Sequence, residues 1–291
     1  MQKALGFIGL GVMGFPMAGH LATKGYKVSV FNRTLRKSQD WIDKYNGTLC
    51  KSLSELAESS EIIFLCVGND DDVKNIINGD DGIINYLKPG TILIDHTTTS
   101  AELPIELNKS LHLKKVNLLD APVSGGQAGA ESGILSVMVG GNKESYKDAK
   151  EIIGAYSKFI KYMGESGSGQ LTKMVNQICI AGLIQALAEG INFSDEVGLN
   201  TKDVIEVISK GAAQSWQMEN RWETMINDEY DHGFAVDLMR KDLDIVLKKA
   251  KKNNISIDIT KVINDYYKDI QKAGGGRLDT SSLLKRIKDL I

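Results

Sequence analysis

Residues 4–31 read ALGFIGLGVMGFPMAGHLATKGYKVSVF, and this stretch decides the fold of the first half of the chain. The apolar run Ala4–Ile8 predicts a strand, Phe15–Lys24 has the spacing of a helix, and Lys27–Phe31 alternates like a second strand. Strand, glycine-rich turn, helix and strand within about thirty residues form the βαβ unit of a dinucleotide-binding domain.

The glycine-rich turn between the first strand and the helix is Gly9-Leu10-Gly11-Val12-Met13-Gly14. In a G-x-G-x-x-G turn the first glycine permits the tight bend, and the second lets the backbone approach a pyrophosphate. The third lets helix and strand pack closely, and the helix N-terminus faces the phosphate charge. An isolated motif of this kind is weak evidence, but the flanking elements favour a cofactor-binding loop over an ordinary turn.

The second strand is followed by Asn32-Arg33-Thr34, which we expect to contact the cofactor. A site specific for NAD usually has an acidic residue here for the ribose 2′-hydroxyl. A carboxylate would repel the 2′-phosphate of NADP, whereas Arg33 can bind it with a planar fork of donors. We therefore predict a preference for NADP. The alternative is that Arg33 is a solvated loop residue and that NAD is accepted as well.

Strand and helix patterns alternate as far as residue 163. Strands are expected at 62–67, 91–95, 117–121, 135–139 and 159–163, and helices at 52–59, 72–78, 101–111 and 143–157. Repeated βα units predict an α/β, Rossmann-type doubly wound sheet that is largely parallel, with helices on both faces. Because ligands bind at the carboxyl ends of such strands, the loop Val67-Gly68-Asn69 is also expected to contact the cofactor.

After Met163 the strand signals stop. Helical spacing recurs at 201–210, 217–226, 234–253, 260–273 and 280–290, so we predict a Rossmann domain at 1–164 and an all-helical domain at 165–291. A long helix within Gly164–Gly198 is expected to link them. Lys173, Asn176 and Gln177 stand three and four residues apart in it, which places all three on one helix face.

Composition and charge exclude several classes of partner. A formal net charge of −2 on 291 residues gives no reason to expect binding to nucleic acid or to an anionic membrane. No apolar run in the sequence suggests a membrane-spanning helix. Three widely separated cysteines predict buried thiols in a reducing compartment, so we expect a cytoplasmic protein. The four histidines do not cluster, and no metal site is expected.

Ser124-Gly125-Gly126 follows the strand expected at 117–121. It supplies a hydroxyl and consecutive unhindered backbone N–H groups, a combination suited to binding a carboxylate. On spacing alone, an ordinary turn is an equally good interpretation. His96 lies in a neighbouring loop, where a lone histidine is more often a structural hydrogen bonder than a catalyst.

The chain resembles the β-hydroxyacid dehydrogenases, a family that includes 3-hydroxyisobutyrate dehydrogenase, tartronate semialdehyde reductase and glyoxylate/succinic semialdehyde reductase. The matching blocks are 6–14 with Met17-Ala18, then 120–126, then 167–176, then Lys241-Asp242-Leu243. Their order and spacing match over nearly the whole chain. The Asn32-Arg33-Thr34 turn is most similar to the glyoxylate/succinic semialdehyde reductase branch, which prefers NADPH.

The resemblance implies a role for each matching position. Lys173 matches the catalytic lysine, and Asn176 matches the amide that helps to hold the substrate. The remaining positions are the substrate-carboxylate segment Ser124, Gly125 and Gly126, the cofactor contacts Thr98 and Lys241, and the cleft residues Phe234 and Asp242. Two positions depart from the family pattern. Gln177 replaces a second asparagine, and three consecutive threonines at 97–99 replace a serine-threonine pair.

The implied activity is NADPH-dependent reduction of a small aldehyde acid, namely glyoxylate, succinic semialdehyde or tartronate semialdehyde. Lysine can supply the proton to the carbonyl oxygen, a role that suits an amine whose pKa is lowered by burial. The alternatives are an NAD(P)-dependent 3-hydroxyisobutyrate dehydrogenase and, more distantly, an imine reductase or a non-catalytic NADP-binding module. The family habit also implies a homodimer or homotetramer.

Overall fold

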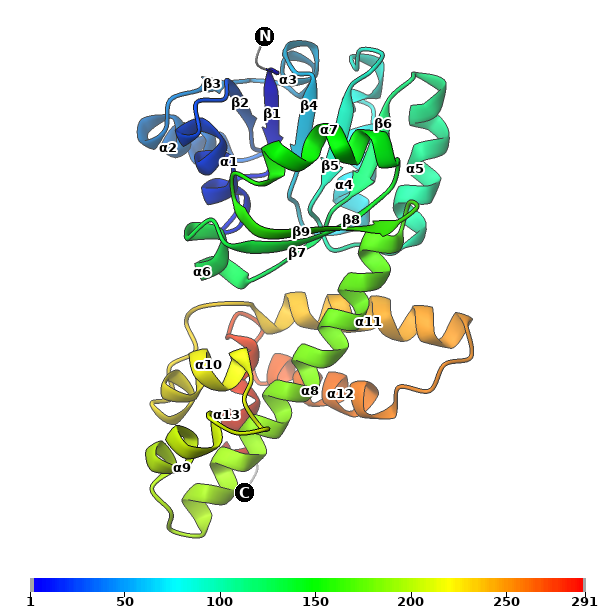
Figure 1. Ribbon diagram of the computed structural model, residues 1–291. Coiled ribbons are helices and arrows are strands. Elements are labelled where there is room, and N and C mark those ends of the chain that lie inside the picture. The colour runs from blue at the N-terminus through cyan, green and yellow to red at the C-terminus, as the bar shows by residue number, and fades with distance from the viewer. Residues whose placement is uncertain (1–2, 290–291) are drawn as a thin grey trace. The chain divides into compact units, whose positions relative to one another are not determined.

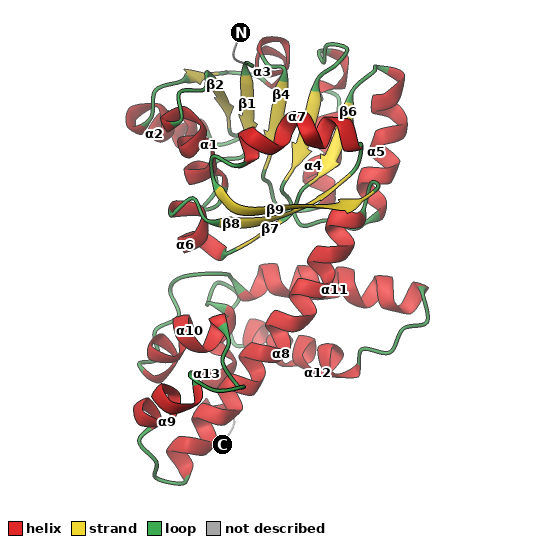
Figure 2. Ribbon diagram, viewed as in Figure 1, coloured by secondary structure: helices red, strands yellow, loops and turns green. Residues whose placement is uncertain are grey.

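The computed structural model describes residues 3–289 and separates the chain into two compact units, one ending at Lys173 and the other beginning at Met174. The first unit contains a sheet with helices (Figures 1 and 2). Its strands are β1 (Leu5–Ile8), β2 (Val28–Phe31), β3 (Thr48–Leu49), β4 (Ile62–Leu65), β5 (Ile92–Asp95), β6 (Asn117–Asp120), β7 (Val123–Ser124), β8 (Leu135–Gly140) and β9 (Ser157–Gly164).

The strand order is β3-β2-β1-β4-β5-β6-β8-β7, with β9 paired to β8. Strands β1 to β6 all run parallel to one another. Strand β8 runs antiparallel to β6, and β9 runs parallel to β8. In register, Phe7 of β1 stands between Val30 of β2 and Phe64 of β4. The strand order therefore reverses at β1, with β2 and β3 on one side of it and β4 to β6 on the other. Rossmann folds bind dinucleotides in the crevice at this point.

Helices cover both faces of this sheet because neighbouring residues of a buried strand point to opposite sides. Phe7 belongs to one hydrophobic cluster, with Met17 and Ile152, whereas Ile8 belongs to another, with Leu56 and Leu107. The helices of this unit are α1 (Gly14–Thr23), α2 (Leu35–Lys44), α3 (Leu53–Ser59), α4 (Asp70–Asn78), η1 (Ile83–Asn85), α5 (Glu102–Leu113), α6 (Gly126–Glu131) and α7 (Lys143–Ile153).

The predicted α/β fold is confirmed, and the differences are local. The helix expected at 143–157 ends at Ile153, since the chain must reach β9 from Ser157 onward. Five elements had not been predicted: α2, the short strands β3 and β7, the short helix η1, and α6, whose sequence GQAGAE has no apolar period.

The second unit contains helices, with no strand among its described residues (Figure 2). Its elements are α8 (Ser168–Glu196, which begins in the first unit), α9 (Thr201–Ile208), α10 (Trp216–Ile226), α11 (Val236–Lys252), α12 (Asp258–Lys272), η2 (Thr280–Ser282) and α13 (Leu283–Asp289). They surround a core that includes Ile184, Ile191, Met239 and Tyr267. The helix expected at 280–290 divides into η2 and α13, and residue 290 lies outside the described range.

Two expectations about the long helix α8 were wrong. By length and composition it qualifies as a membrane-crossing helix, with a mean hydropathy of 1.4 over its best window. One such helix is weak evidence for a membrane, because core helices of other proteins have the same length and composition, and 44% of this apolar stretch is buried inside the protein. Cys179, expected to be buried, is exposed on the same helix, whereas Cys50 is buried and Cys66 is intermediate.

Candidate cofactor and active site

Two of the three glycines in the first loop are required by the packing of the protein itself, and the third is not. Gly9 has φ of +96°, and a Cβ there would lie 2.2 Å from the carbonyl oxygen of Cys66. A Cβ at Gly14 would lie 1.9 Å from the carbonyl oxygen of Gly9. A Cβ at Gly11 would meet nothing within 4 Å, so this glycine is not required by the protein's own packing. The space beside Gly11 is where a pyrophosphate would be accommodated.

Helix α1 begins at Gly14 directly after this loop. Its N-cap residue Met13 makes no side-chain capping hydrogen bond, and the first turn contains no acidic residue. The first N–H groups of the helix and its positive dipole end are therefore suited to a phosphate. Together with the glycine geometry, this helix end fits the dinucleotide expected from the sequence.

In the loop after β2, one side chain is hydrogen-bonded within the protein and its neighbour is exposed to solvent. Asn32 holds the glycine loop, because its Oδ1 accepts from Leu10 N at 2.9 Å and its Nδ2 donates to the Thr34 carbonyl at 3.1 Å. The side chain of Arg33 is 93% exposed, and its one ion pair within residues 3–289 is a 3.9 Å approach to Asp72. Such a long, solvated pair contributes little, so the guanidinium can move toward an incoming phosphate.

The loop after β4 is also held by its neighbours. Val67 N donates to Thr97 Oγ1 at 3.1 Å, and Gly68 N donates to Asp72 Oδ2 at 3.2 Å. Asn69 caps helix α4 by accepting from Asp72 N at 2.9 Å. The predicted contact segment Val67-Gly68-Asn69 is thus fixed at the carboxyl end of β4, beside the strand that carries the glycine loop.

The three consecutive threonines after β5 differ in accessibility. Thr97 and Thr99 are 2% and 1% exposed, and both take part in internal hydrogen bonds. Thr98 is half-buried and is the most accessible of the three. The prediction that Thr98 contacts the cofactor is compatible with this arrangement.

Lys173 is buried on α8 and donates from Nζ to the carbonyl oxygen of Val123 at 2.8 Å. Val123 directly precedes Ser124-Gly125-Gly126, the segment expected to bind a carboxylate. Gly125 and Gly126 have φ of +139° and +63°, and a Cβ at Gly126 would meet nothing within 4 Å. The first unit therefore brings the lysine and the glycine segment together, although 50 residues separate Lys173 from Val123.

Asp120 and Gln170 hold the start of α8, and sequence reasoning assigned neither of them a role. The Asp120 carboxylate accepts from Gly167 N at 2.8 Å and from Gln170 N at 3.0 Å. The Gln170 side chain accepts from Thr99 N at 3.1 Å and donates to the Thr97 carbonyl at 2.7 Å. These bonds fix Lys173 one turn further along and tie it to the threonine loop. A charged residue ending the apolar strand β6 was the one available signal.

Two buried carboxyl groups lie at the ends of neighbouring strands. Burial raises the pKa of Asp95 to about 7, against the lowering effect of hydrogen bonds from Thr97. Burial likewise raises the pKa of Asp120 to about 6, against the backbone N–H groups of Gly167 and Gln170. Asp95 Oδ1 accepts from Thr97 N at 2.9 Å, and this hydrogen bond fixes the backbone at the start of the threonine loop.

His96 is a structural residue. One ring nitrogen lies 2.6 Å from the Ala121 carbonyl, and the other lies 2.8 Å from the Tyr156 hydroxyl. Both nitrogens are therefore engaged inside the core, 3% exposed, where the ring stacks on Phe64. Burial lowers the pKa of His96 to about 4. The view of His96 as a hydrogen bonder fits these contacts.

We expect His96→Asn to change how stability depends on pH. The unfolded chain protonates this histidine near pH 6.5 and the folded chain near pH 4, so wild-type stability falls as pH drops through this window. Between pH 6.5 and pH 5 the loss is about 2 kcal/mol. The variant is less stable at pH 7, and its deficit relative to wild type narrows by this amount at pH 5. Urea unfolding at both pH values measures it, and a constant deficit would contradict the burial argument.

In the second unit, the predicted residues of α8 and α11 form a hydrogen-bonded chain. Asn176 Nδ2 donates to Gln177 Oε1 at 2.8 Å, and Gln177 Nε2 donates to Asp242 Oδ2 at 2.7 Å. Asp242 Oδ1 lies 3.1 Å from Lys241 Nζ. Gln177 thus uses both ends of its amide within the protein, while Asn176 remains half-buried. The predicted contact of Asn176 with substrate stays a prediction, as does that of Gln177.

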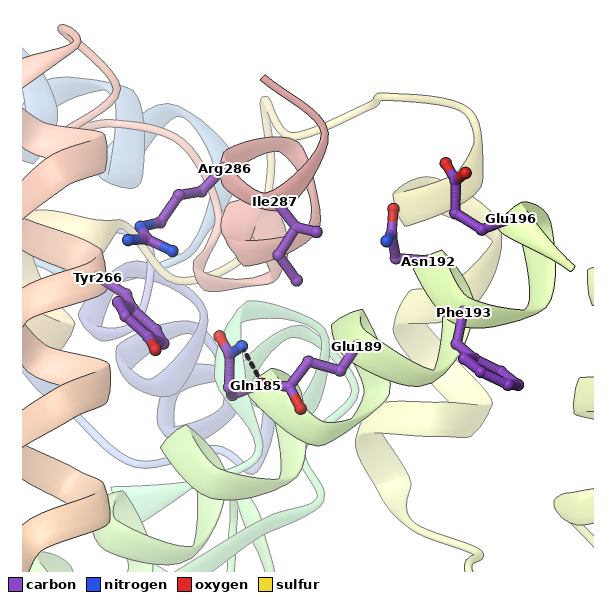
Figure 3. A pocket seen from close by; sticks show the side chains of 8 residues that line it. All are labelled: Gln185, Glu189, Asn192, Phe193, Glu196, Tyr266, Arg286 and Ile287. Atoms are coloured by element: carbon purple, nitrogen blue, oxygen red, sulfur yellow. Dashed lines mark hydrogen bonds between the residues drawn. The ribbon is translucent and has the colours of Figure 1, made fainter. Parts of the chain in front are cut away.

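Phe234 is partly buried against the core of the second unit, and its N–H donates to Asp279 Oδ2 at 2.8 Å. A pocket of about 330 Å³ lies elsewhere in this unit, lined by Gln185, Glu189, Asn192, Phe193, Glu196, Tyr266, Arg286 and Ile287 (Figure 3). None of the predicted site residues lines it. Residues 3–289 contain no cluster of three metal-binding side chains.

The glycine loop, the uncapped helix start and the buried lysine define a nicotinamide-dependent oxidoreductase. Comparisons with known proteins agree. Residues 4–164 match the family described as the NAD binding domain of 6-phosphogluconate dehydrogenase, and residues 167–287 match the NAD-binding domain of NADP-dependent 3-hydroxyisobutyrate dehydrogenase. The chain belongs to the β-hydroxyacid dehydrogenase family, and is an NAD(P)-dependent dehydrogenase that acts on hydroxyl groups.

Relatives align over almost the full length. The chain is 50% identical over 282 residues to an uncharacterized oxidoreductase of Shewanella frigidimarina, covering 97% of both chains. It is 32% identical to 2-hydroxy-3-oxopropionate reductase of Escherichia coli, covering 98% of this chain and 97% of the other. The crystal structure of a 3-hydroxyisobutyrate dehydrogenase from Salmonella typhimurium superposes with a TM-score of 0.87 at 26% identity, covering 98% and 99%.

Proposed function

We propose that this chain reduces a small aldehyde acid to the hydroxy acid with NADPH. Glyoxylate, succinic semialdehyde and tartronate semialdehyde are the candidate substrates. The observation that carries the proposal is the 2.8 Å contact between Lys173 Nζ and the Val123 carbonyl, next to Ser124-Gly125-Gly126. It holds a proton donor beside a segment suited to a carboxylate, as a substrate with an aldehyde near an acid group requires.

In the proposed reaction, different residues bind the substrate, donate the proton and position the proton donor. Hydride to the carbonyl carbon is the contribution of the reduced cofactor when it is bound. Ser124 and the N–H groups of Gly125 and Gly126 hold the substrate carboxylate. Lys173 delivers a proton to the carbonyl oxygen as negative charge grows there, and regains a proton from solvent afterwards. Asp120 and Gln170 keep α8 in place, so that the amine is oriented before substrate arrives.

The main alternative is oxidation of 3-hydroxyisobutyrate, with Lys173 removing the hydroxyl proton. Arg33 favours the reductive reading, because an exposed guanidinium at the end of β2 suits the 2′-phosphate and NADPH is usually held reduced in cells. An imine reductase needs no carboxylate-binding segment, and a non-catalytic module needs no buried lysine. The E. coli relative is by name a reductase of 2-hydroxy-3-oxopropionate, which is tartronate semialdehyde.

A turnover screen tests the proposal. Purified protein is assayed with NADPH and with NADH against the three aldehyde acids and, in the oxidative direction, against 3-hydroxyisobutyrate with NADP and NAD. We expect the highest kcat/KM for one of the aldehyde acids with NADPH. Faster turnover of 3-hydroxyisobutyrate at matched concentrations would replace the proposal with the oxidative alternative.

We expect Arg33→Ala to weaken NADPH much more than NADH. A charge-assisted phosphate contact contributes about 1.5–3 kcal/mol, so the Kd for NADPH should rise roughly tenfold to a hundredfold. Fluorescence titration of both cofactors measures the effect. Arg36→Ala is the matched control, because its side chain is also exposed but pairs with Asp40 on α2. Equal losses for both cofactors at position 33 would mean that Arg33 does not bind the 2′-phosphate.

We also propose a cytoplasmic location, supported by the free thiols of Cys50, Cys66 and Cys179.

A further inference from the structure

The side chain of Gln170 binds the backbone on both sides of Thr98, the middle threonine of the loop after β5. Its Nε2 donates to the Thr97 carbonyl at 2.7 Å, and its Oε1 accepts from Thr99 N at 3.1 Å. The orientation of the amide is fixed, because a carbonyl cannot donate and an N–H cannot accept. Gln170 is fully buried, so both hydrogen bonds are shielded from water. The conformation of Thr98 therefore depends on a residue of α8.

The threonine loop is itself held to the sheet. Thr97 N donates to Asp95 Oδ1 at 2.9 Å, and Thr97 Oγ1 accepts from Val67 N at 3.1 Å. Asp95 ends β5 and Val67 lies just after β4, so Thr97 is tied to the ends of two neighbouring parallel strands. With the bond from Gln170, the N–H, the hydroxyl and the carbonyl of Thr97 all have partners. Thr98 is consequently the accessible residue of a loop that has little freedom to move.

Helix α8 is equally fixed at the position of Gln170. The backbone N–H of Gln170 donates to Asp120 Oδ2 at 3.0 Å. Lys173 follows three positions later on the same face of the helix, with about 5–6 Å between the two Cβ atoms. The Lys173 amine donates to the Val123 carbonyl at 2.8 Å. Gln170 therefore joins the loop of Thr98 directly to the helical turn that carries Lys173.

Reduction of a carbonyl group needs two donors at fixed positions. Hydride reaches the carbon while a proton reaches the oxygen, so the two donors must face neighbouring atoms of one substrate. A displacement of about 1 Å in such a geometry can lower the rate roughly a hundredfold. We propose that Gln170 is a positioning residue, which sets the spacing between the nicotinamide contact Thr98 and the proton donor Lys173. This role rests on the proposed function, in which Lys173 supplies the proton, and on the predicted contact of Thr98 with the cofactor.

Gln170→Met tests this role directly. Methionine is similar in length and shape but forms neither hydrogen bond, so Thr98 and Lys173 are no longer held to each other. We expect kcat to fall roughly tenfold to a hundredfold, while the Kd for NADPH changes less than about threefold. Single-turnover kinetics and fluorescence titration of NADPH measure the two quantities. An active wild type with an equal kcat in Gln170→Met would overturn the proposal, whereas an inactive wild type would contradict the proposed function itself.

Asn142→Ala is the control for a loss of stability alone. Asn142 Oδ1 accepts from Ser145 N at 2.9 Å and caps α7, away from the threonine loop. Removing an N-cap destabilises the protein, so thermal unfolding should show a lower melting temperature in this variant as in Gln170→Met. At a temperature where both variants are folded, only Gln170→Met should lose turnover. An equal fall of kcat in Asn142→Ala would overturn the proposal, because lower stability would then account for the effect.

Gln170→Glu supplies a test that depends on pH. Its carboxylate can accept from Thr99 N but cannot donate to the Thr97 carbonyl, whereas the protonated carboxyl can do both. Burial beside a carbonyl raises the pKa of such a glutamate above its ordinary value of about 4.3, so the protonated form becomes populated as pH falls. We expect the ratio of kcat in Gln170→Glu to kcat in wild type to rise between about pH 8 and pH 6. A constant ratio would overturn the proposal, because a merely structural loss does not reverse with pH.

Discussion

Lys173→Ala should lower kcat by about two to four orders of magnitude while NADPH binding is retained. The variant loses the group that neutralises charge on the carbonyl oxygen, but the glycine loop and Arg33 are unchanged. Single-turnover kinetics and a fluorescence titration of NADPH separate the two effects. Near-normal turnover would show that Lys173 is not the proton donor.

Two further variants sharpen this experiment. Lys173→Arg keeps a positive charge but cannot release its proton at neutral pH, so it should be nearly as inactive as the alanine variant. Recovery of activity in the arginine variant would assign Lys173 an electrostatic role instead of proton transfer. Lys161→Ala is the matched control, because it removes an exposed lysine of the same unit and should leave kcat unchanged.

Gly11→Ala should raise the Kd for NADPH about a hundredfold without affecting the stability of the cofactor-free protein. The added methyl group meets no protein atom within 4 Å, so the fold has room for it. It would occupy the space in which the pyrophosphate approaches the backbone. Titration with NADPH and thermal unfolding of the cofactor-free protein measure the two quantities separately.

Gly9→Ala provides the contrast. Its methyl group would lie 2.2 Å from the Cys66 carbonyl at a φ of +96°, so it should lower the melting temperature before any cofactor is added. If Gly11→Ala bound NADPH as tightly as wild type, the loop would not be the pyrophosphate site. If Gly11→Ala were destabilised as much as Gly9→Ala, the space beside Gly11 would belong to protein packing.

The elements that sequence predicted well are those with a strong local pattern. Strands β1, β4 and β5 are short apolar runs bounded by turn residues, and the glycine spacing fixes the first βαβ unit. Helix α2 was missed because seven of the ten residues in its sequence LRKSQDWIDK are polar, although one of the three apolar residues, Trp41, is fully buried. Cys179 was misplaced because sequence alone did not show which face of α8 would lie outside the core.

In the candidate site, too, residues within local motifs could be predicted from sequence, and residues that act through long-range contacts could not. Lys173 and the glycine segment could be proposed as site residues from the sequence, because they stand in motifs that resemble those of a known family, and their roles stay predictions. Asp120 and Gln170 could not, since their roles depend on hydrogen bonds to residues 47 to 73 positions away. Long-range contacts of this kind are fixed by the fold and leave no periodic signal in the chain.

The anchoring of α8 has a consequence for modularity. The family match to the cofactor domain ends at residue 164, whereas the compact first unit continues to Lys173. A protein cut at residue 164 would lack both N–H groups that Asp120 accepts from, and a buried carboxylate without partners is strongly destabilising. The cofactor domain as bounded by the family match is therefore not expected to fold independently. A chimera that joins it to another helical domain would have to retain residues 165–173 of this chain.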